Sequence, residues 1–212
     1  MTFDFPKIYP ITDRRISGLS HCEQVKRLIR GGATLIQLRE KDASPRDFYA
    51  DASAALVVAH SAGAKLIIND RVDIALALKA DGVHLGQSDM PVAAVRRLLG
   101  KDTIIGFSTH NLQQVKAALH LPIDYLVFGP IFTTTSKAKP DPVAGLTELG
   151  KIKPELTSLP LVAIGGLDLT NIENVLTAGA DAVAVISAIL ADPSQIAQKF
   201  NNLSASAIPK MR

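Results

Sequence analysis

The sequence is poor in cysteine and in aromatic residues. Among its 212 residues there is one cysteine, Cys22, there is no tryptophan, and aromatics make up 5%. A single cysteine excludes an intrachain disulfide and offers no zinc-ligand spacing. Its place beside Glu23 in a predicted helix favours a buried or partly buried bystander over a nucleophile. With few aromatics, the core must rest on Val, Ile, Leu and Ala, which suits a parallel sheet covered by helices.

The chain also lacks a strong net charge and any long hydrophobic run. The net charge is +3, and no block of Lys and Arg marks a nucleic-acid or membrane surface. No apolar stretch approaches membrane-spanning length, and the N-terminus shows no basic region followed by an apolar one. The balance of 47% hydrophobic and 20% charged residues is typical of a globular protein. We therefore expect one cytoplasmic domain over residues 1–212, with neither nucleic acid nor a membrane as partner.

Short apolar runs that end in polar residues recur along the whole chain. They cover residues 8–13, 35–41, 66–70, 83–87, 104–109, 125–130, 161–166 and 183–187. Amphipathic segments of helical length lie between them, at 21–30, 45–60, 71–79, 91–99, 112–119, 146–151, 171–178 and 193–202. This alternation predicts linked βα units with parallel strands.

Two layouts fit such an alternation, an open doubly wound sheet or a closed barrel. The number of runs and the spread of polar chemistry over almost every run end favour a single (β/α)₈ TIM barrel of the α/β class, with its active site at the carboxyl ends of the strands. The segment 133–142 is long, polar and without periodicity, so we predict an active-site loop there. We expect the tail from Ser204 onward to fray or to dock on a partner.

The second run ends in alternating polar residues. Gln37, Arg39 and Lys41 share one face of a strand, so their side chains can converge. Two cations and an amide suit a polyanion such as diphosphate. The alternative is a solvated strand end with surface ion pairs through Glu40 and Asp42, and the residues alone leave both open.

Two acidic residues follow the third and fourth runs. Asp70 ends one run, and Asp89 comes shortly after the next. Mg²⁺ usually takes one or two carboxylates and completes its shell with water and phosphate oxygens, so this pair is a candidate metal site. Each aspartate alone could instead cap the helix that follows it.

The last two runs end in a pattern suited to phosphate. Gly165-Gly166 and Ile186-Ser187 each precede a helix, whose N-terminus presents free N–H groups, although a Gly-Gly pair is often only a turn. His110 is a candidate general acid or base, and His84 is expected to be a packed, hydrogen-bonded barrel residue. The remaining histidines are expected on helix surfaces or in loops: His21, His60 and His120. Thr12-Asp13 is expected only to cap the barrel mouth.

The ordered set of run ends resembles the motifs of the thiamine phosphate synthase family over nearly the whole chain. The segments that carry the resemblance are 9–13, 37–41, 68–71, 82–87 with Asp89, Gly106 with 108–110, 129–132 and 164–166. The resemblance implies a (β/α)₈ barrel that joins 4-amino-2-methyl-5-(diphosphooxymethyl)pyrimidine to a thiazole phosphate, or to its carboxylate. The products would be thiamine monophosphate and diphosphate.

The resemblance also implies roles for individual residues. The pyrimidine diphosphate would be bound by Gln37, Leu38, Arg39, Glu40, Lys41, Asn69, Ser108 and Lys137. The thiazole phosphate would be bound by Thr134, Thr135, Ser136, Gly166, Ile186 and Ser187. Asp70 and Asp89 would hold Mg²⁺. Arg39, Lys41, Lys137 and Ser108 would serve catalysis as diphosphate leaves in a dissociative step, with no protein nucleophile.

The loop departs from the family pattern at two positions, with Thr133 in place of a proline and Ser136 in place of a threonine. Ser136 keeps a hydroxyl, whereas the loss of the proline leaves the loop less restrained. Two other functions remain open. One is a related thiazole tautomerase, which would use an acid or base such as His110, and the other is a non-catalytic binder of phosphorylated metabolites. The oligomeric state stays open, a homo-oligomer included.

Overall fold

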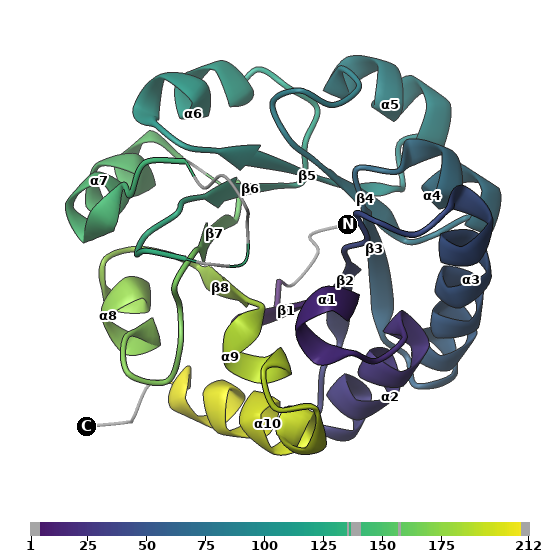
Figure 1. The fold of residues 1–212 in the computed structure, drawn as a ribbon. Coiled ribbons are helices and arrows are strands. Elements are labelled where there is room, and N and C mark those ends of the chain that lie inside the picture. The colour runs from purple at the N-terminus through teal and green to yellow at the C-terminus, as the bar shows by residue number, and fades with distance from the viewer. Residues whose placement is uncertain (1–4, 135, 137–140, 157, 209–212) are drawn as a thin grey trace.

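The structure, a computed structural model, describes residues 5–134, 136, 141–156 and 158–208. Eight parallel strands close into one barrel in sequence order, and β1 pairs with β8 through the register Ile8↔Val183 (Figure 1). The strands are β1 Ile8–Thr12, β2 Leu35–Leu38, β3 Lys65–Asn69, β4 Gly82–Leu85, β5 Ile104–Thr109, β6 Tyr125–Phe128, β7 Leu161–Ile164 and β8 Ala182–Val185. The predicted (β/α)₈ barrel is therefore confirmed.

A ring of helices surrounds the barrel (Figure 1). Those that follow the sequence pattern are α2 His21–Arg30, α3 Pro45–Ser61, α4 Val72–Leu78, α5 Val92–Leu99, α6 Leu112–Ala118, α7 Gly145–Ile152 and α8 Ile172–Thr177. Local chemistry sets several of their starts. The Ser20 hydroxyl accepts a hydrogen bond from the Glu23 N–H, and Ser44 caps α3 ahead of Pro45 at its first position.

The C-terminal helix corrects one expectation. Pro193–Gln195 form a 3₁₀ turn (η2), and α10 runs from Ile196 to Ser206. The helix therefore continues past Ser204, and Ala207 behind it is buried, whereas Ala205, Ser206 and Ile208 are exposed. Three further short elements were not predicted: α1 Arg14–Ser17, α9 Ser187–Leu190 and the 3₁₀ turn η1 Lys153–Glu155.

The core has two layers. The larger one packs the helices against the outside of the barrel and is built of Val, Ile, Leu and Ala with a few aromatics. The smaller one fills the barrel interior, where Tyr9 and Tyr125 are the largest side chains and both are fully buried. Gly106 makes room for one of them, because a Cβ there would lie 2.0 Å from Cζ of Tyr125. The barrel is thus a packed core with a polar tyrosine pair near its centre.

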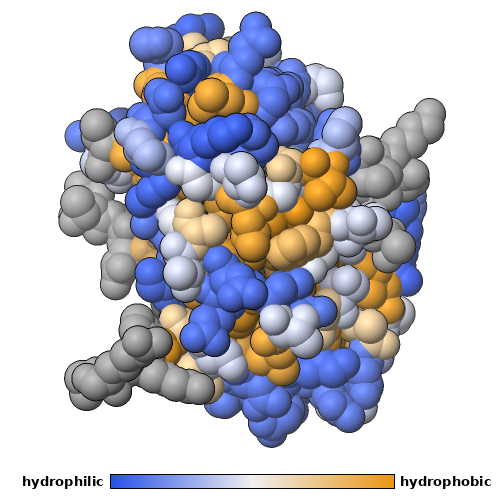
Figure 2. Space-filling view, turned by 90° about the vertical axis from the view of Figure 1, so that its left-hand side faces the viewer, coloured by the Kyte–Doolittle hydropathy of each residue, from blue (hydrophilic) through white to orange (hydrophobic). Residues whose placement is uncertain are grey.

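The outer surface is mixed in polarity. On the side where α7 and α8 lie, Figure 2 shows apolar residues gathered across the middle of the face, with polar residues above and below. Exposed apolar side chains include Val143 before α7 and Leu169 before α8. In the described part of the chain, no helix has the length and apolar character needed to cross a membrane.

Candidate active site

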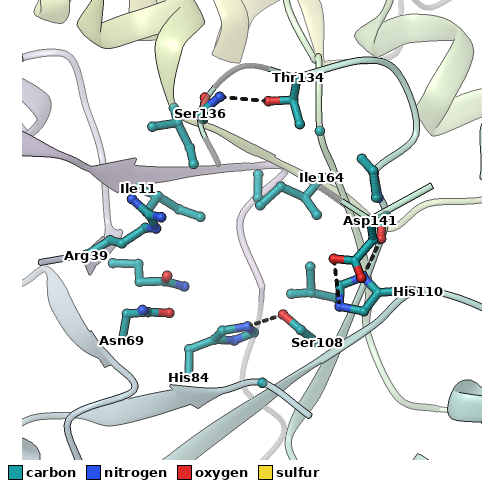
Figure 3. A pocket seen from close by; sticks show the side chains of 18 of the residues that line it. Ile11, Arg39, Asn69, His84, Ser108, His110, Thr134, Ser136, Asp141 and Ile164 are labelled. Atoms are coloured by element: carbon teal, nitrogen blue, oxygen red, sulfur yellow. Dashed lines mark hydrogen bonds and ion pairs between the residues drawn. The ribbon is translucent and has the colours of Figure 1, made fainter. Parts of the chain in front are cut away.

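One cavity of about 770 Å³ opens at the carboxyl ends of the strands. Each strand contributes a lining side chain: Ile11, Gln37, Asn69, His84, Ser108, Val127, Ile164 and Ala184. The size suits one or two small organic molecules. Asn69, His84 and Ser108 point into the cavity in Figure 3, and so does Arg39, which directly follows β2.

The cationic end of the cavity lies where β2 ends. Arg39 and Lys41 line it together with Gln37, as the alternation predicts. The Arg39 guanidinium pairs with the Asp13 carboxylate, and the Lys41 ammonium pairs with Asp70. The alternative of a solvated strand end fails for Arg39, whose side chain is 13% exposed.

Two neighbours of these cations lie outside the cavity. Leu38 is fully buried among the apolar residues between barrel and helices. The Glu40 carboxylate accepts hydrogen bonds from the N–H groups of Lys41 (2.8 Å), Asp42 (2.9 Å) and Ala43 (3.1 Å), so it folds back onto its own loop. The structure therefore places the side chains of Leu38 and Glu40, both predicted to bind substrate, away from the cavity.

The acidic edge of the cavity joins the ends of β3 and β4. Asp70 has a φ of 61° and pairs with Lys41, while Asp89 Oδ2 accepts a hydrogen bond from the Gly86 N–H at 2.6 Å. The helix-cap alternative is wrong for both, because α4 and α5 begin behind Arg71 and Pro91 with no side-chain cap. Burial, followed by the neighbouring Asp70 carboxylate, raises the pKa of Asp89.

The donor set at this edge fits one kind of metal. The Asp70 carboxylate helps to raise the pKa of Asp89, so the two carboxylates lie close enough to repel each other. A bound cation would offset this repulsion, and both carboxylates are hard oxygen donors. Among the described residues, no group of three or more His, Cys, Asp or Glu side chains forms a site that could hold a metal ion. The edge therefore fits Mg²⁺ that is shared with substrate oxygens, and it does not fit a fully protein-built cage.

The opposite end of the cavity is formed after β7 and β8. Gly165 and Gly166 have φ values of 100° and 65°, and a Cβ on Gly166 would lie 2.5 Å from the Thr133 carbonyl oxygen. Glycine is required here because the backbone that follows β6 packs directly on it. Ile186 and Ser187, at the start of α9, line the same end. Backbone is thus exposed to the cavity where the sequence predicts a phosphate.

The loop after β6 contributes two of its predicted residues. Thr134 and Ser136 line the cavity, and the Ser136 N–H donates to the Thr134 hydroxyl at 3.3 Å (Figure 3). Thr135 and Lys137 lie outside the described residues. Asp141, at the end of the loop, lies 3.6 Å from Nε2 of His110.

Three of the histidines can be compared with their predicted surroundings. His84 is buried and hydrogen-bonded as predicted, and burial lowers its pKa to about 4. His110 lines the cavity, with Nδ1 2.6 Å from the Gly129 carbonyl oxygen, so this nitrogen donates. The prediction for His21 is wrong. It is fully buried, with Nδ1 2.7 Å from the Thr12 hydroxyl and Nε2 3.2 Å from Glu40.

Several cavity residues were not predicted. Arg15, on the first turn of α1, lines the mouth and lies 3.4 Å from Asp42. Gln87 and Gln114 also face the cavity, and Gln87 Nε2 donates to the Ser108 carbonyl at 2.6 Å. The signal for Arg15 was present in the two arginines directly after Asp13, but a four-residue helix leaves no periodicity by which to orient them.

Comparison with known proteins agrees with this geometry. The family model described as thiamine monophosphate synthase (TMP-TENI) matches residues 8–189. A thiamine-phosphate synthase of Clostridium novyi (strain NT) is 47% identical over 87% of this chain and 90% of its own. One from Chloroflexus aurantiacus is 46% identical over 87% of this chain and 85% of its own. A solved thiamine phosphate pyrophosphorylase from Pyrococcus furiosus superposes with a TM-score of 0.85 and 36% identity, over 95% of both chains.

The barrel and its cavity, which is cationic at one end and lined by open backbone at the other, define a (β/α)₈-barrel enzyme of the transferase class. The matched residues make the assignment more specific. The chain belongs to the thiamine monophosphate synthase family, and its reaction is a step of thiamine biosynthesis.

Proposed function

We propose that this enzyme condenses 4-amino-2-methyl-5-(diphosphooxymethyl)pyrimidine with thiazole phosphate to give thiamine monophosphate and diphosphate. One observation supports the proposal most strongly. A single cavity has one end where Arg39 and Lys41 lie beside the carboxylates of Asp70 and Asp89, and a separate end formed by the backbone after β7 and β8. Two differently built anion sites on one cavity match two phosphorylated substrates that must meet.

The pyrimidine diphosphate is assigned to the end formed by Gln37, Arg39, Lys41, Asn69 and Ser108. Lys137, which lies outside the described residues, stays a predicted ligand of the same diphosphate. The bond between the exocyclic carbon and the diphosphate oxygen breaks, and its electron pair leaves with the diphosphate. Arg39 and Lys41 stabilise the negative charge that develops on that oxygen. The electron-rich aminopyrimidine delocalises the cation left behind.

The thiazole phosphate is assigned to the opposite end, with its phosphate on the backbone of Gly166, Ile186 and Ser187 and on the hydroxyls of Thr134 and Ser136. Thr135 stays a predicted ligand outside the described residues. The lone pair of the thiazole nitrogen then forms the new C–N bond. The nitrogen becomes quaternary without losing a proton, so the step needs no general base. No protein nucleophile takes part, and Cys22 does not line the cavity.

Asp70 and Asp89 would hold Mg²⁺ at the edge of the diphosphate end. When bound, the ion supplies positive charge to the diphosphate leaving group. Lys41 lies against Asp70 and keeps this edge from becoming strongly anionic.

The test is product formation from the two substrates with Mg²⁺, followed by mass spectrometry or thiochrome fluorescence. Thiamine monophosphate is the expected product. A thiazole tautomerase would instead aromatise a thiazole carboxylate phosphate without any pyrimidine, and a non-catalytic binder would retain both substrates without product. A cytoplasmic location, one domain over residues 1–212, small molecules as the only partners and any homo-oligomer remain predictions.

A further inference from the structure

A chain of five hydrogen-bonded side chains crosses the floor of the cavity. Nε2 of Gln37 lies 3.1 Å from the Tyr9 hydroxyl, which lies 2.9 Å from the Tyr125 hydroxyl. The chain continues from Tyr125 to Nδ1 of His84 at 3.1 Å, and from Nε2 of His84 to the Ser108 hydroxyl at 2.8 Å (Figure 3 shows the last of these contacts). Only the two ends, Gln37 and Ser108, have a role in the proposed reaction.

The donors and acceptors in this chain can be assigned in order. An amide nitrogen can only donate, so the Tyr9 oxygen accepts from Gln37. The hydrogen of Tyr9 then goes to Tyr125, and that of Tyr125 goes to Nδ1 of His84. With Nδ1 as an acceptor, the imidazole hydrogen sits on Nε2 and is donated to Ser108. The hydrogen of Ser108 is left for the cavity.

The opposite order leaves a buried group without a partner. If Tyr125 donated to Tyr9, the hydrogen of the fully buried Tyr9 hydroxyl would have no acceptor among the described residues. In the part of the chain that the structure describes, every buried side-chain nitrogen or oxygen has a hydrogen-bond partner. Burial raises the pKa of both tyrosines and lowers that of His84, so both phenols keep their hydrogens and the imidazole carries one.

We infer that Tyr125 and His84 are positioning residues that hold Ser108 as a hydrogen-bond donor toward the pyrimidine diphosphate, and that Tyr9 holds the amide of Gln37 at the other end. The identity of that ligand rests on the proposed function, whereas the direction of the chain does not. At the other end, Oε1 of Gln37 is left to accept from a donor in the cavity. The chain therefore sets opposite hydrogen-bonding character at two points of the substrate site.

The tautomer of His84 reports the direction in which the five side chains donate their hydrogen bonds. We expect ¹⁵N NMR of the full-length protein without substrates to show hydrogen on Nε2 and none on Nδ1 of His84, with His84→Asn used to assign the signals. A hydrogen on Nδ1 would mean that the chain runs from Ser108 to Gln37, and it would overturn the inference. This measurement needs no turnover, so its outcome is separate from that of the product assay.

Two tyrosine variants test whether the chain acts on the substrate. Tyr125→Phe removes the donor to His84, so we expect mixed tautomers and a KM for the pyrimidine diphosphate raised about tenfold, with the KM for thiazole phosphate within about twofold of wild type. Tyr9→Phe is the control for the tautomer alone, because Tyr125 still donates to His84 and the Nε2–H tautomer persists, whereas the loss of the Tyr9 hydroxyl also releases Gln37. The same tautomer of His84 in the two variants, or a wild-type KM for the pyrimidine diphosphate in Tyr125→Phe, would contradict the inference.

A double-variant cycle separates positioning from packing. If Tyr125 acts through Ser108, Tyr125→Phe adds less than about twofold to the loss already caused by Ser108→Ala. A full tenfold further loss in that background would show that Tyr125 supports the site by packing alone, and the proposed role would be wrong.

Discussion

Asp13 is a buried carboxylate that serves both a helix and a cavity residue. Its Oδ1 accepts the Arg15 N–H at 2.9 Å and caps α1, while Oδ2 receives the Arg39 guanidinium. Its own N–H donates to Gln24 at 3.0 Å, so the carboxylate is fixed from several directions. Asp13 therefore does more than the expected capping of the barrel mouth. It holds Arg39 through one guanidinium nitrogen and leaves the other N–H groups of Arg39 available to the cavity.

Removing this carboxylate should weaken binding of the pyrimidine diphosphate. We expect Asp13→Ala to raise the KM for that substrate about tenfold or more, since Arg39 loses a charged partner. Asp13→Asn keeps a good helix cap and a hydrogen-bond acceptor, so its effect should be smaller. Steady-state kinetics with each substrate varied in turn measures both. Ser20→Ala, which removes only the cap of α2, is the matched control, and an equal KM in Ser20→Ala and Asp13→Ala would contradict the assignment.

Asp89 gives a second prediction at the residue scale. Asp89→Ala should abolish condensation at low Mg²⁺, because one of the two carboxylates at the acidic edge is lost. Asp89→Asn keeps one oxygen donor, and we expect excess MgCl₂ to restore part of its activity. The measurement is turnover against MgCl₂ concentration, with EDTA added to wild type. Wild-type turnover in Asp89→Ala together with no effect of EDTA would remove the metal assignment.

At the scale of elements, three aspartates at the base of the barrel repeat the same hydrogen-bond arrangement. Asp81, Asp124 and Asp181 each directly precede an even-numbered strand and accept the N–H of a residue in the preceding odd-numbered strand. The acceptor distances are 2.8 Å to Leu66, 2.7 Å to Ile105 and 2.9 Å to Leu161. Each aspartate also pairs with a basic side chain, His60, Arg96 or Lys153. These carboxylates join successive strands at the end opposite the cavity.

Because these aspartates lie at the end of the barrel opposite the cavity, we expect the replacement of one of them to lower the stability of the protein without lowering its activity. Asp124→Ala leaves the buried Ile105 N–H without its acceptor and Arg96 without its charged partner, so we expect a loss of about 2–3 kcal/mol in the free energy of unfolding. Urea unfolding measures this loss, and kcat and both KM values should stay at wild type because the site is at the other end of the barrel. A large drop in kcat at full folding would contradict this division. Asp102→Ala, at an exposed turn, is the control.

The sequence predicts elements well where periodicity is long and poorly where it is short. The strands and α2 to α8 follow from apolar runs and caps such as Ser20 and Ser44. By contrast, α1 and α9 have four residues each, too few for a period, and their positions depend on packing over the barrel mouth. Arg15 was missed as a cavity residue for this reason.

Contacts between distant segments explain the remaining differences in the candidate site. Gln37 reaches the cavity as strand alternation predicts, and Asn69 and Ser108 reach it as the family resemblance implies. Local spacing allowed Asp70 to cap a helix, whereas its partner is Lys41 from the neighbouring strand end. His21 has the spacing of a surface residue on α2, yet Thr12 and Glu40 surround its ring. Local sequence therefore locates chemistry on elements, and the closed barrel decides which residues face each other.

At the scale of the whole molecule, two buried histidines make stability depend on pH. Burial lowers the pKa of His84 to about 4 and also lowers that of His21, from an ordinary value of 6.5. In the unfolded chain both rings bind protons as pH falls below about 6.5. In the folded protein His84 stays neutral down to about pH 4, and His21 takes up its proton at a lower pH than in the unfolded chain. The unfolded state therefore gains protons first, so stability falls as pH decreases from about 6.5 toward 4 and is full above that window.

The window between pH 6.5 and 5 separates this effect from the carboxylates whose pKa values are lowered. Glu23, Glu40, Asp73 and Asp192 have lowered pKa values, so their contribution is lost only at more acid pH, and the raised pKa of Asp89 acts with the opposite sign. We expect His84 alone to cost the wild type about 1.5 kcal/mol in the free energy of unfolding between these two pH values. Urea unfolding at each pH measures the difference, and His84→Gln should reduce it whatever its effect on absolute stability. His120→Gln, at an exposed position, controls for the loss of an imidazole. A stability that stays level in wild type from pH 6.5 to 5 would mean that the buried rings take up protons as readily as exposed ones.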